Sequence, residues 1–374
     1  MKLPVLCVTL SLTAMPLCAA DSAEALIKTL ASVGREGEGN ELASAAWKSA
    51  VALGPKAIGA VLSQTGTGSP VADNWLRLAG NAIVDDSLKS GKALPLAELE
   101  DFVKKTANSE AARILAFDLL RQADFSRAEA LQRALIHDPV QPLRRGAVAH
   151  LIATAAALQG DAAKKAYLTA LDAVRDEDQT KVVADELKKL GFPVNLPRHF
   201  GFLTKWSVIG PFDNTDRAGF ERVYPPETEI VLSKTYEGKE KPVKWLPFES
   251  TDDYGKLDFN KPLTALKQST AYAYTTFESA SGREAELRLG CKNAWKVWLN
   301  GKLLFARDEY HRGQRMDQYK LKCQLRKGTN EILVKCCQNE QTESWTVEWE
   351  FQLRVCDSGG TAILSAKSDP SASR

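Results

Sequence analysis

Two hydrophobic periodicities divide this chain, and the change between them limits its fold more than any other feature. Residues 21–196 are rich in Ala and Leu, and their apolar side chains recur at helical spacing. Residues 201–356 hold six of the eight Trp and seven of the eight Tyr, and apolar residues there alternate with polar ones. Pro193 and Pro197 stand between the two patterns. The sequence therefore predicts an α+β protein with an N-terminal all-α domain, residues 21–196, and a C-terminal antiparallel β domain, residues 201–356.

The helical half is divided into short segments by Gly and Pro residues, of which Gly160 and Gly191 are clear examples. Apolar stripes at helical spacing fill the segments between these breaks. Helices are expected over residues 22–33, 42–53, 55–63, 71–90, 95–106, 110–123, 126–136, 142–159, 161–175 and 178–190.

A weak internal repeat runs through these helices. Strings that begin at Arg77, Arg113 and Arg145 align with offsets of 36 and 32 residues. Periods of this size are typical of stacked helical hairpins, which cannot bury their apolar faces alone. Asp138 and Pro139, followed by two arginines and an apolar stripe, resemble a HEAT repeat. A HEAT-like domain is therefore expected, with an irregular helical bundle as the alternative.

The second half predicts a β-sandwich or jelly roll. Asn300 and Gly301 stand between two apolar runs, which indicates a type I′ hairpin because both turn positions need a positive φ. Residues 345–355 alternate strictly, so one strand is expected there, with Trp345 and Trp349 on its apolar face. Further strands are expected at residues 204–209, 243–248, 271–278, 284–290, 318–325 and 331–337.

Five cysteines lie in the β half, an odd number that leaves at least one unpaired within a monomer. A hairpin of residues 318–325 and 331–337 would make Cys323 and Cys336 diagonal neighbours, with Cβ atoms about 7–8 Å apart. A disulfide needs about 3.5–4.5 Å, so no bond between them is expected. Cys337 would point to the opposite face and is expected to be the more exposed thiol.

Residues 287–304, which include the Trp-Leu-Asn-Gly string that ends at Gly301, resemble the galactose-binding-like jelly roll. Residues 327–335 look like a later strand of the same domain, and residues 206–214 resemble a lead-in found in large secreted bacterial proteins. The mature chain thus resembles uncharacterised secreted proteins with HEAT-like repeats followed by such a jelly roll. The loop from Cys291 to Ala294 lacks the two acidic residues of many relatives, which weakens any sugar or calcium site there.

The N-terminus carries the pattern of a secretory signal peptide. Lys2 precedes an apolar stretch, and small residues follow it up to Ala20. Cleavage is expected after Ala20, which predicts a secreted or periplasmic protein. A lipid anchor at Cys18 is disfavoured because Leu17 stands where a small residue is normal. Residues 357–374 are expected to be a flexible C-terminal tail.

The charge balance excludes some partners. Lys and Arg total 49 against 47 Asp and Glu, a net charge of +2. That balance argues against a protein built mainly to hold nucleic acid or an anionic membrane. Beyond the N-terminal segment no apolar run is long enough for a membrane span.

No pattern of residues predicts catalysis. His137, His150, His199 and His311 are scattered, and the chain has no HExxH, CxxC or GxSxG motif. The string from Thr65 to Ser69 lacks the Lys and the spacing of a phosphate-binding loop. The sequence therefore predicts no enzyme, no metal site and no cofactor.

The densest group of polar and aromatic residues lies at 307–319, between two expected strands. Such a loop on a rigid sandwich can bind a polar ligand or a protein partner. A solvated loop with internal Arg–Asp pairs is the alternative. Trp298 shares its face with Lys296 and could stack on a sugar, or it could be covered by a loop. The candidate binding residues are Trp298, Tyr310, His311, Arg312, Asp317 and Tyr319.

These observations favour a non-catalytic binding or scaffolding protein that recognises a protein or a glycan through its jelly-roll loops. The alternative is an accessory or degenerate component of a polysaccharide hydrolase. A pair of carboxylates about 5–9 Å apart in a cleft would favour the hydrolase. An exposed aromatic strip without such carboxylates would favour glycan binding.

Overall fold

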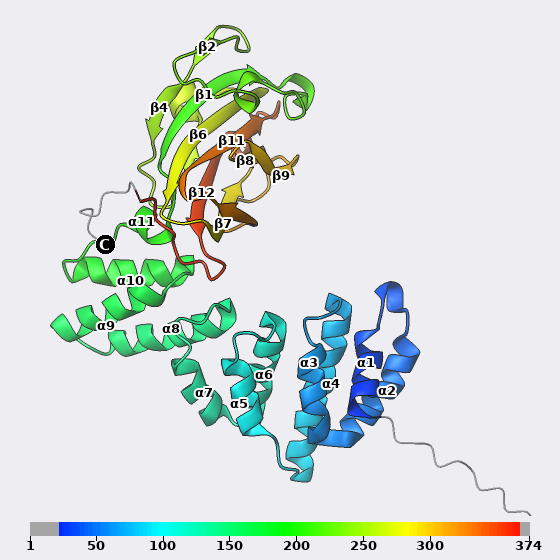
Figure 1. The fold of residues 1–374 in the computed structure, drawn as a ribbon. Coiled ribbons are helices and arrows are strands. Elements are labelled where there is room, and N and C mark those ends of the chain that lie inside the picture. The colour runs from blue at the N-terminus through cyan, green and yellow to red at the C-terminus, as the bar shows by residue number, and fades with distance from the viewer. Residues whose placement is uncertain (1–21, 367–374) are drawn as a thin grey trace, which may run out of the picture. The chain divides into compact units, whose positions relative to one another are not determined.

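The structure, a computed structural model, describes residues 22–366. A helical part is followed by antiparallel sheets, which confirms the predicted α+β class (Figure 1). The described residues divide into two compact units, the first ending at Ala134 and the second beginning at Leu135. The expected signal peptide at residues 1–20 and residues 367–374 of the expected tail lie outside the described part.

The first unit is helical. Its elements are α1 (Ala23–Ala31), η1 (Arg35–Gly37), α2 (Asn40–Leu53), η2 (Gly54–Ala57), α3 (Ile58–Gln64), α4 (Pro70–Ser90), α5 (Leu96–Lys104), α6 (Glu110–Ala123) and α7 (Phe125–Arg133). The side chains of Ser22, Ser69 and Ser109 accept hydrogen bonds from N–H groups in the first turns of α1, α4 and α6. Helix α1 packs on α2, and α5 packs on α6, so the helices associate as consecutive pairs.

The second unit begins with helices α8 (Gln141–Ala156), α9 (Gly160–Ala173), α10 (Glu177–Lys189) and α11 (Leu196–Phe200). Val148, Tyr167, Leu171 and Val183 are buried together where α8, α9 and α10 meet. Every helix that the sequence predicts is present in the two units. The short helix α11 was not predicted, and Asn195 begins it by accepting a hydrogen bond from the N–H of Arg198.

Two buried arginines repeat one structural role in the helical part. Arg113 donates from Nε to the carbonyl of Val103 at 2.7 Å, and Arg144 donates from Nη1 to the carbonyl of Asp138 at 2.8 Å. Each side chain thus binds backbone that precedes its own helix. Arg145, which the sequence repeat aligned with Arg113, pairs instead with Asp178. The equivalent position is therefore Arg144, one residue before the alignment placed it.

The β part is a sandwich of a six-stranded sheet and a four-stranded sheet. The strands are β1 (Lys205–Asp213), β4 (Leu246–Glu249), β5 (Leu257–Asp258), β6 (Ser269–Ser279), β7 (Arg283–Cys291), β8 (Ala294–Leu299), β9 (Lys302–Arg307), β10 (Tyr319–Leu325), β11 (Gly328–Gln338) and β12 (Glu350–Cys356). The sheet orders are β4-β1-β6-β11-β8-β9 and β10-β7-β12-β5, with all neighbours antiparallel. Strands β2 (Thr235–Tyr236) and β3 (Val243–Lys244) form a separate pair. The Asn-Gly turn is confirmed, since φ is 53° at Asn300 and 77° at Gly301.

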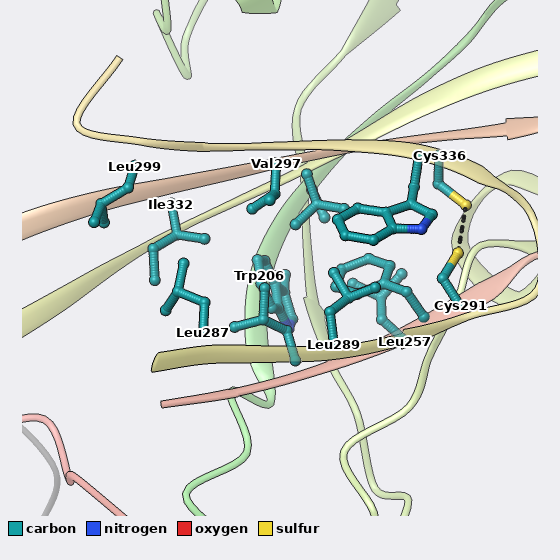
Figure 2. Close-up of a cluster of buried hydrophobic side chains, with 14 of the residues drawn as sticks. Trp206, Leu257, Leu287, Leu289, Cys291, Val297, Leu299, Ile332 and Cys336 are labelled. Atoms are coloured by element: carbon teal, nitrogen blue, oxygen red, sulfur yellow. Dashed lines mark hydrogen bonds between the residues drawn. The ribbon is translucent and has the colours of Figure 1, made fainter. Parts of the chain in front are cut away.

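Apolar side chains from both sheets fill the space between them. Figure 2 shows Val297 of β8 facing Leu287 and Leu289 of β7. Trp349 is also fully buried here, as the sequence predicts. This shared core follows from alternation, because every second residue of each strand faces the other sheet.

Strands β10 and β11 do not form the hairpin that the sequence predicts. Strand β10 pairs with β7, whereas β11 pairs with β6 and β8 in the other sheet. The connection is a corner held by Asn330, whose Oδ1 accepts from the N–H of Arg326 and whose Nδ2 donates to the carbonyls of Arg326 and Gly328. A short turn between two alternating strands therefore changes sheets here because one buried Asn replaces the ladder hydrogen bonds.

The cysteines lie accordingly in different places from those expected. All five are free, and Cys337 is fully buried, so the prediction that it is the exposed thiol was wrong. Cys323 is the partly exposed one. Cys291 and Cys336 face each other across the core with their Sγ atoms 3.8 Å apart (Figure 2).

The strand expected at residues 345–355 is shorter than predicted. Residues Ser344–Thr346 form the 3₁₀ turn η5, and β12 begins at Glu350. The Thr346 hydroxyl donates to the carbonyls of Gln341 and Glu343, just before this turn, and Gln338 Nε2 donates to the Thr346 carbonyl at 3.0 Å. These bonds bend the chain, so Trp345 is 58% exposed rather than part of the core. The alternation of apolar and polar residues could not show at which residue the strand begins to pair with its neighbours.

The residues just after β12 continue the folded unit. The Ile363 N–H donates to Val355, and the Ala366 N–H donates to Glu278 on β6. Residues 357–366, which the sequence assigned to a flexible tail, are thus bound to both sheets.

Helix α11 connects the helices of the second unit to the sandwich. The Phe200 side chain is buried, and its ring contacts those of Phe202 and Tyr254, at centroid distances of 5.7 and 6.0 Å. The Phe200 carbonyl accepts from Arg354 at 3.0 Å. The boundary expected between residues 196 and 201 therefore falls inside a packed element.

We expect a fragment of residues 196–374 to unfold at a higher Tm than a fragment of residues 201–374. The shorter fragment loses the buried Phe200 ring, a loss of about 3–5 kcal/mol, which lowers the Tm by on the order of 10 °C in a domain of this size. Circular dichroism melts of both fragments measure the difference. Equal Tm values would show that α11 adds nothing to the sandwich.

His199, also on α11, is kept neutral by its surroundings. Its Nε2 atom is buried and has no hydrogen-bond partner. Burial, reinforced by the positive charge of Arg175, lowers the pKa of His199 to about 4. The unfolded chain, in which His has a pKa of about 6.5, then binds more protons than the folded chain between these values.

Stability should therefore fall as the pH decreases from 6.5 toward 4, by roughly 2–3 kcal/mol from this group. In the variant His199→Gln that part of the pH dependence should disappear. Chemical denaturation at a series of pH values measures it, with the exposed His137→Gln as the matched control. The same loss of stability in His199→Gln and in the wild type would contradict a buried neutral imidazole.

Candidate functional site

The loop of residues 308–318 connects β9 of the six-stranded sheet to β10 of the four-stranded sheet. It therefore crosses from one layer of the sandwich to the other. His311 and Asp317 have φ values of 56° and 58°, in the left-handed region. Such backbone is sparsely populated for residues with a Cβ and is held by surrounding contacts.

Asp317 supplies the strongest of these contacts. Its carboxylate accepts from Arg354 Nε and Nη2 at 2.7 and 2.6 Å and from Arg288 Nη1 at 2.7 Å. Burial alone would raise the pKa of Asp317, but the hydrogen bonds and charges of the two arginines outweigh it and hold the pKa below its usual range. All of this carboxylate is used inside the protein, so the structure places Asp317 in the support of the loop and not on a ligand surface.

Tyr310 and Tyr319 are also partly structural. The Tyr310 hydroxyl accepts from Asn214 Nδ2 at 3.2 Å, and the ring packs against Phe220. Burial raises the Tyr310 pKa. The Tyr319 ring lies beside Trp295, with centroids 5.0 Å apart, at the margin of the core. Each tyrosine thus keeps only part of its ring available to solvent.

His311 and Arg312 lie on the surface of the loop. His311 Nε2 is 2.7 Å from the side-chain oxygen of Asn339, and its ring meets Trp345 edge-on at 5.3 Å. Arg312 is exposed and pairs with Glu309 at 3.3 Å. The structure therefore joins His311 to Trp345, which sequence alternation had assigned to the core.

A cavity of about 570 Å³ opens along the same loop. Within the described part of the chain it is lined by Arg307, Glu309, Arg312, Gly313, Gln314, Arg315, Gln318 and Tyr319. The three arginines outnumber the one carboxylate, so the lining carries a net positive charge. Glu309 already accepts from Arg307 at 2.7 Å.

Gln314 is the unsatisfied group in this cavity. Both polar atoms of its side chain are buried and have no hydrogen-bond partner. Gln318, by contrast, is fully used, since it accepts from the N–H of Cys291 and donates to the carbonyl of Gly313. An unpaired buried amide is costly, and a polar ligand would supply the missing partners. Nothing in the sequence distinguished Gln314 from its polar neighbours.

The lining does not contain the carboxylate pair that glycoside hydrolysis uses, because Glu309 is the only acidic residue among the described residues that form it. Over residues 22–366, no group of three or more His, Cys, Asp or Glu side chains is placed to hold a metal ion. The same residues include no helix that is both long and apolar enough to cross a membrane.

Trp298 lies away from this cavity and is covered. It is 8% exposed and belongs to a second apolar cluster on the outer face of the six-stranded sheet, with Tyr274 and Leu333. Chain segments that include Tyr224, Tyr236 and the separate pair β2–β3 cover this face. The alternative that a loop covers Trp298 is therefore the one the structure shows, and its indole offers no surface for a sugar.

Lys335 holds that covering segment in place. Its ammonium is fully buried and donates to the carbonyls of Phe220 and Arg222 at 3.0 and 2.8 Å and to Glu227 at 2.8 Å. Tyr272 donates to the same carboxylate at 2.5 Å. Burial lowers the pKa of Lys335 and the bond to Glu227 partly restores it. The charge is thus paired and its donors are satisfied.

The variant Lys335→Met should be destabilised by about 3–5 kcal/mol, because Glu227 would remain as a buried charge without its partner. Denaturant unfolding of the full chain measures the change. Lys296→Met, on the adjacent strand and paired with the exposed Glu221, should cost much less. A comparable loss in both variants would show that the pairing of Lys335 has no special weight.

Comparisons with known proteins do not identify the chain. No known protein family matches it, and no curated protein matches it. Among solved structures, a β-glucosidase from Kluyveromyces marxianus in complex with glucose aligns at 13% identity and a TM-score of 0.20, over 24% of this chain and 11% of that one. A GH31 alpha-xylosidase from Xanthomonas citri aligns at 12% identity and a TM-score of 0.21, over 42% of this chain and 16% of that one. This chain therefore matches only a small part of those proteins, at a level that supports no assignment.

Proposed function

We propose that this chain is a non-catalytic binding protein that holds a glycan in the cavity of the loop between β9 and β10. The observation that carries this proposal is the Gln314 amide, which is buried without partners in a cavity lined by arginines and Tyr319. The resemblance of residues 287–304 to the galactose-binding-like jelly roll supports the same class of function. The signal-peptide pattern of residues 1–20 supports a place outside the cytoplasm, where glycans are abundant.

The shape and chemistry of the cavity favour a glycan over a protein surface. A volume of about 570 Å³ is in the range of sites for small ligands. Its lining is dominated by guanidinium, amide and carboxylate groups, which suit hydroxyl-rich molecules because each can make two directed hydrogen bonds. Apolar anchors in a buried patch, which are typical of protein interfaces, are not prominent in this lining.

Trp345 extends the proposed site. Its indole is 58% exposed and is fixed by His311, the neighbour of Arg312 in the chain. A large exposed aromatic ring beside polar groups offers an apolar face on which a sugar ring can lie. The lining holds a single carboxylate, which is already paired with arginine, and this favours binding over hydrolysis in the proposal.

The test is a glycan array probed with the mature full chain, followed by titration of the bound glycan. Trp345→Ala should weaken binding by about tenfold, equivalent to about 1.4 kcal/mol. Because Trp345 is exposed, its stability effect should stay within about 0.5 kcal/mol. Val347→Ala, which removes another exposed apolar side chain from the same segment, is the matched control and should bind normally.

A second variant tests the cavity itself. Gln314→Leu removes the unsatisfied amide, so it should leave stability unchanged or raise it while reducing glycan binding. An array without any bound glycan, or variants that bind as the wild type does, would reject the proposal. Release of reducing sugar from a bound polysaccharide would instead favour the hydrolase alternative.

A further inference from the structure

A second, smaller cavity lies inside the second unit, away from the loop between β9 and β10. Its volume is about 220 Å³, and it lies where the chain that follows β12 meets the helices. It is lined by residues from three segments, namely His137, Asp138, Pro139, Arg144, Arg175, Asp357, Ser358, Gly359 and Thr361. The two arginines come from α8 and from the connection between α9 and α10.

Arg175 enters this cavity without an acidic partner. Its Nε donates to the Thr361 hydroxyl at 3.2 Å, and its Nη1 donates to the carbonyl of Val174 at 2.6 Å. Among the described residues no carboxylate lies within ion-pair distance of it, and Nη2 has no hydrogen-bond partner. Two neutral oxygens therefore orient the guanidinium, which forms no direct ion pair, and the carboxylate of Asp357 acts on its charge only from a longer distance.

Arg144 also lacks an acidic partner, and it is more deeply buried than Arg175. Only 5% of it is exposed. Its Nη1 donates to the carbonyls of Asp138 and Pro139, whereas its Nε is buried and unpartnered. Over residues 22–366 no carboxylate approaches it within 4.0 Å. A buried donor without an acceptor is rare and costly, and a charged one more so.

The neighbouring arginines show how this protein treats a buried guanidinium that needs no ligand. Arg288 pairs with Asp317 and Glu286, and Arg354 pairs with Asp317 in two hydrogen bonds. The acidic residues of the small cavity are used differently. The Asp357 carboxylate accepts from the N–H of Thr361, and that of Asp138 accepts from the N–H of Val140. They stabilise turns and do not pair with the two arginines.

The electrostatic effect of this arrangement is consistent with an empty anion site. Burial lowers the pKa of Arg144 and of Arg175, and the charge of Arg144 lowers that of Arg175 further. Nearby carboxylates, with Asp176 the largest for Arg144 and Asp357 the largest for Arg175, offset only part of this lowering. Both guanidinium groups remain charged at neutral pH because their ordinary pKa is above 12. An anion between the two guanidinium groups would offset their mutual repulsion, whereas a neutral ligand would not.

We propose that this cavity binds a small oxyanion, a carboxylate or phosphate group, through Arg144 and Arg175. Guanidinium forks match the two oxygens of such groups, and the open donors are Nε of Arg144 and Nη2 of Arg175. The volume corresponds to about seven water molecules, which fits one anionic group and a short attached fragment but not an extended chain. The site is independent of the proposed glycan cavity.

Thermal unfolding of the full chain tests the proposal with sodium phosphate, sodium glucuronate and sodium chloride at equal ionic strength. A ligand that binds only the folded state stabilises it by RT ln(1 + [L]/Kd), which is about 2.7 kcal/mol at a hundred times Kd. We expect a higher Tm of the second unit in phosphate or glucuronate than in chloride. The Arg175→Gln variant should lose this difference, since it keeps a polar side chain but not the charged fork.

Arg145→Gln is the matched control, because Arg145 is next to Arg144 on α8 but pairs with Asp178 and does not line the cavity. It should retain the wild-type response to oxyanions. Thr361→Val, which removes only the hydroxyl that orients Arg175, should reduce the response without removing charge. A response to phosphate alone identifies a phosphate ligand, and a response to glucuronate alone identifies a carboxylate. Equal Tm values in all three salts, or an undiminished response in Arg175→Gln, would overturn the proposal.

Discussion

The rest of the β part depends on the ion pairs of Asp317 with Arg288 and Arg354. Arg288 and Arg354 lie directly opposite each other on β7 and β12, a position where like charges repel. The carboxylate of Asp317 lies within 2.7 Å of both and compensates them. Arg354 then reaches the carbonyls of Phe200 and Gly360, and Arg288 reaches that of Ser358. One acidic side chain thus connects the β9–β10 loop, helix α11 and the segment after β12.

This network also lies next to both of the proposed sites. It anchors the C-terminal end of the β9–β10 loop, so the cavity around Gln314 has a rigid base. It also binds the backbone of residues 358 and 360, next to Thr361, which orients Arg175. The arginines that face the small cavity are those that the network does not compensate. Arginines with a direct ion pair and arginines without one are therefore neighbours within one unit.

The sequence was sufficient for most of the elements and insufficient for how the strands pair. Helices were predicted because Gly and Pro breaks coincide with the ends of apolar stripes, and the strands because alternation is a property of single strands. Pairing is a property of two strands, so the separation of β10 from β11 into different sheets could not be predicted from either one. Trp345 was predicted to lie in the core for the same reason. The apolar–polar alternation extends to Trp345, although the paired strand β12 begins only at Glu350.

The candidate site was predicted in part for a similar reason. The loop is the dense polar and aromatic segment that the sequence singled out, and His311 and Arg312 lie on its surface, but its role in binding stays a prediction. Asp317 and Trp298 have the composition of binding residues, but their roles depend on Arg288, Arg354 and Lys335, which lie on other strands. Gln314 became visible only as a buried amide without hydrogen-bond partners, and Arg175 only as a guanidinium without an acidic partner, and sequence does not record what a side chain lacks.

The crossing of the β9–β10 loop has a consequence for motion. Arg307 ends a strand of the six-stranded sheet and Tyr319 begins a strand of the four-stranded sheet, and both line the same cavity. A ligand that contacts both residues would connect the two sheets. The ligand would then stabilise residues outside the loop as well, since the two sheets could separate only after it dissociates. Amide hydrogen exchange would then slow in strands that the ligand never touches, because global opening carries the added free energy of binding.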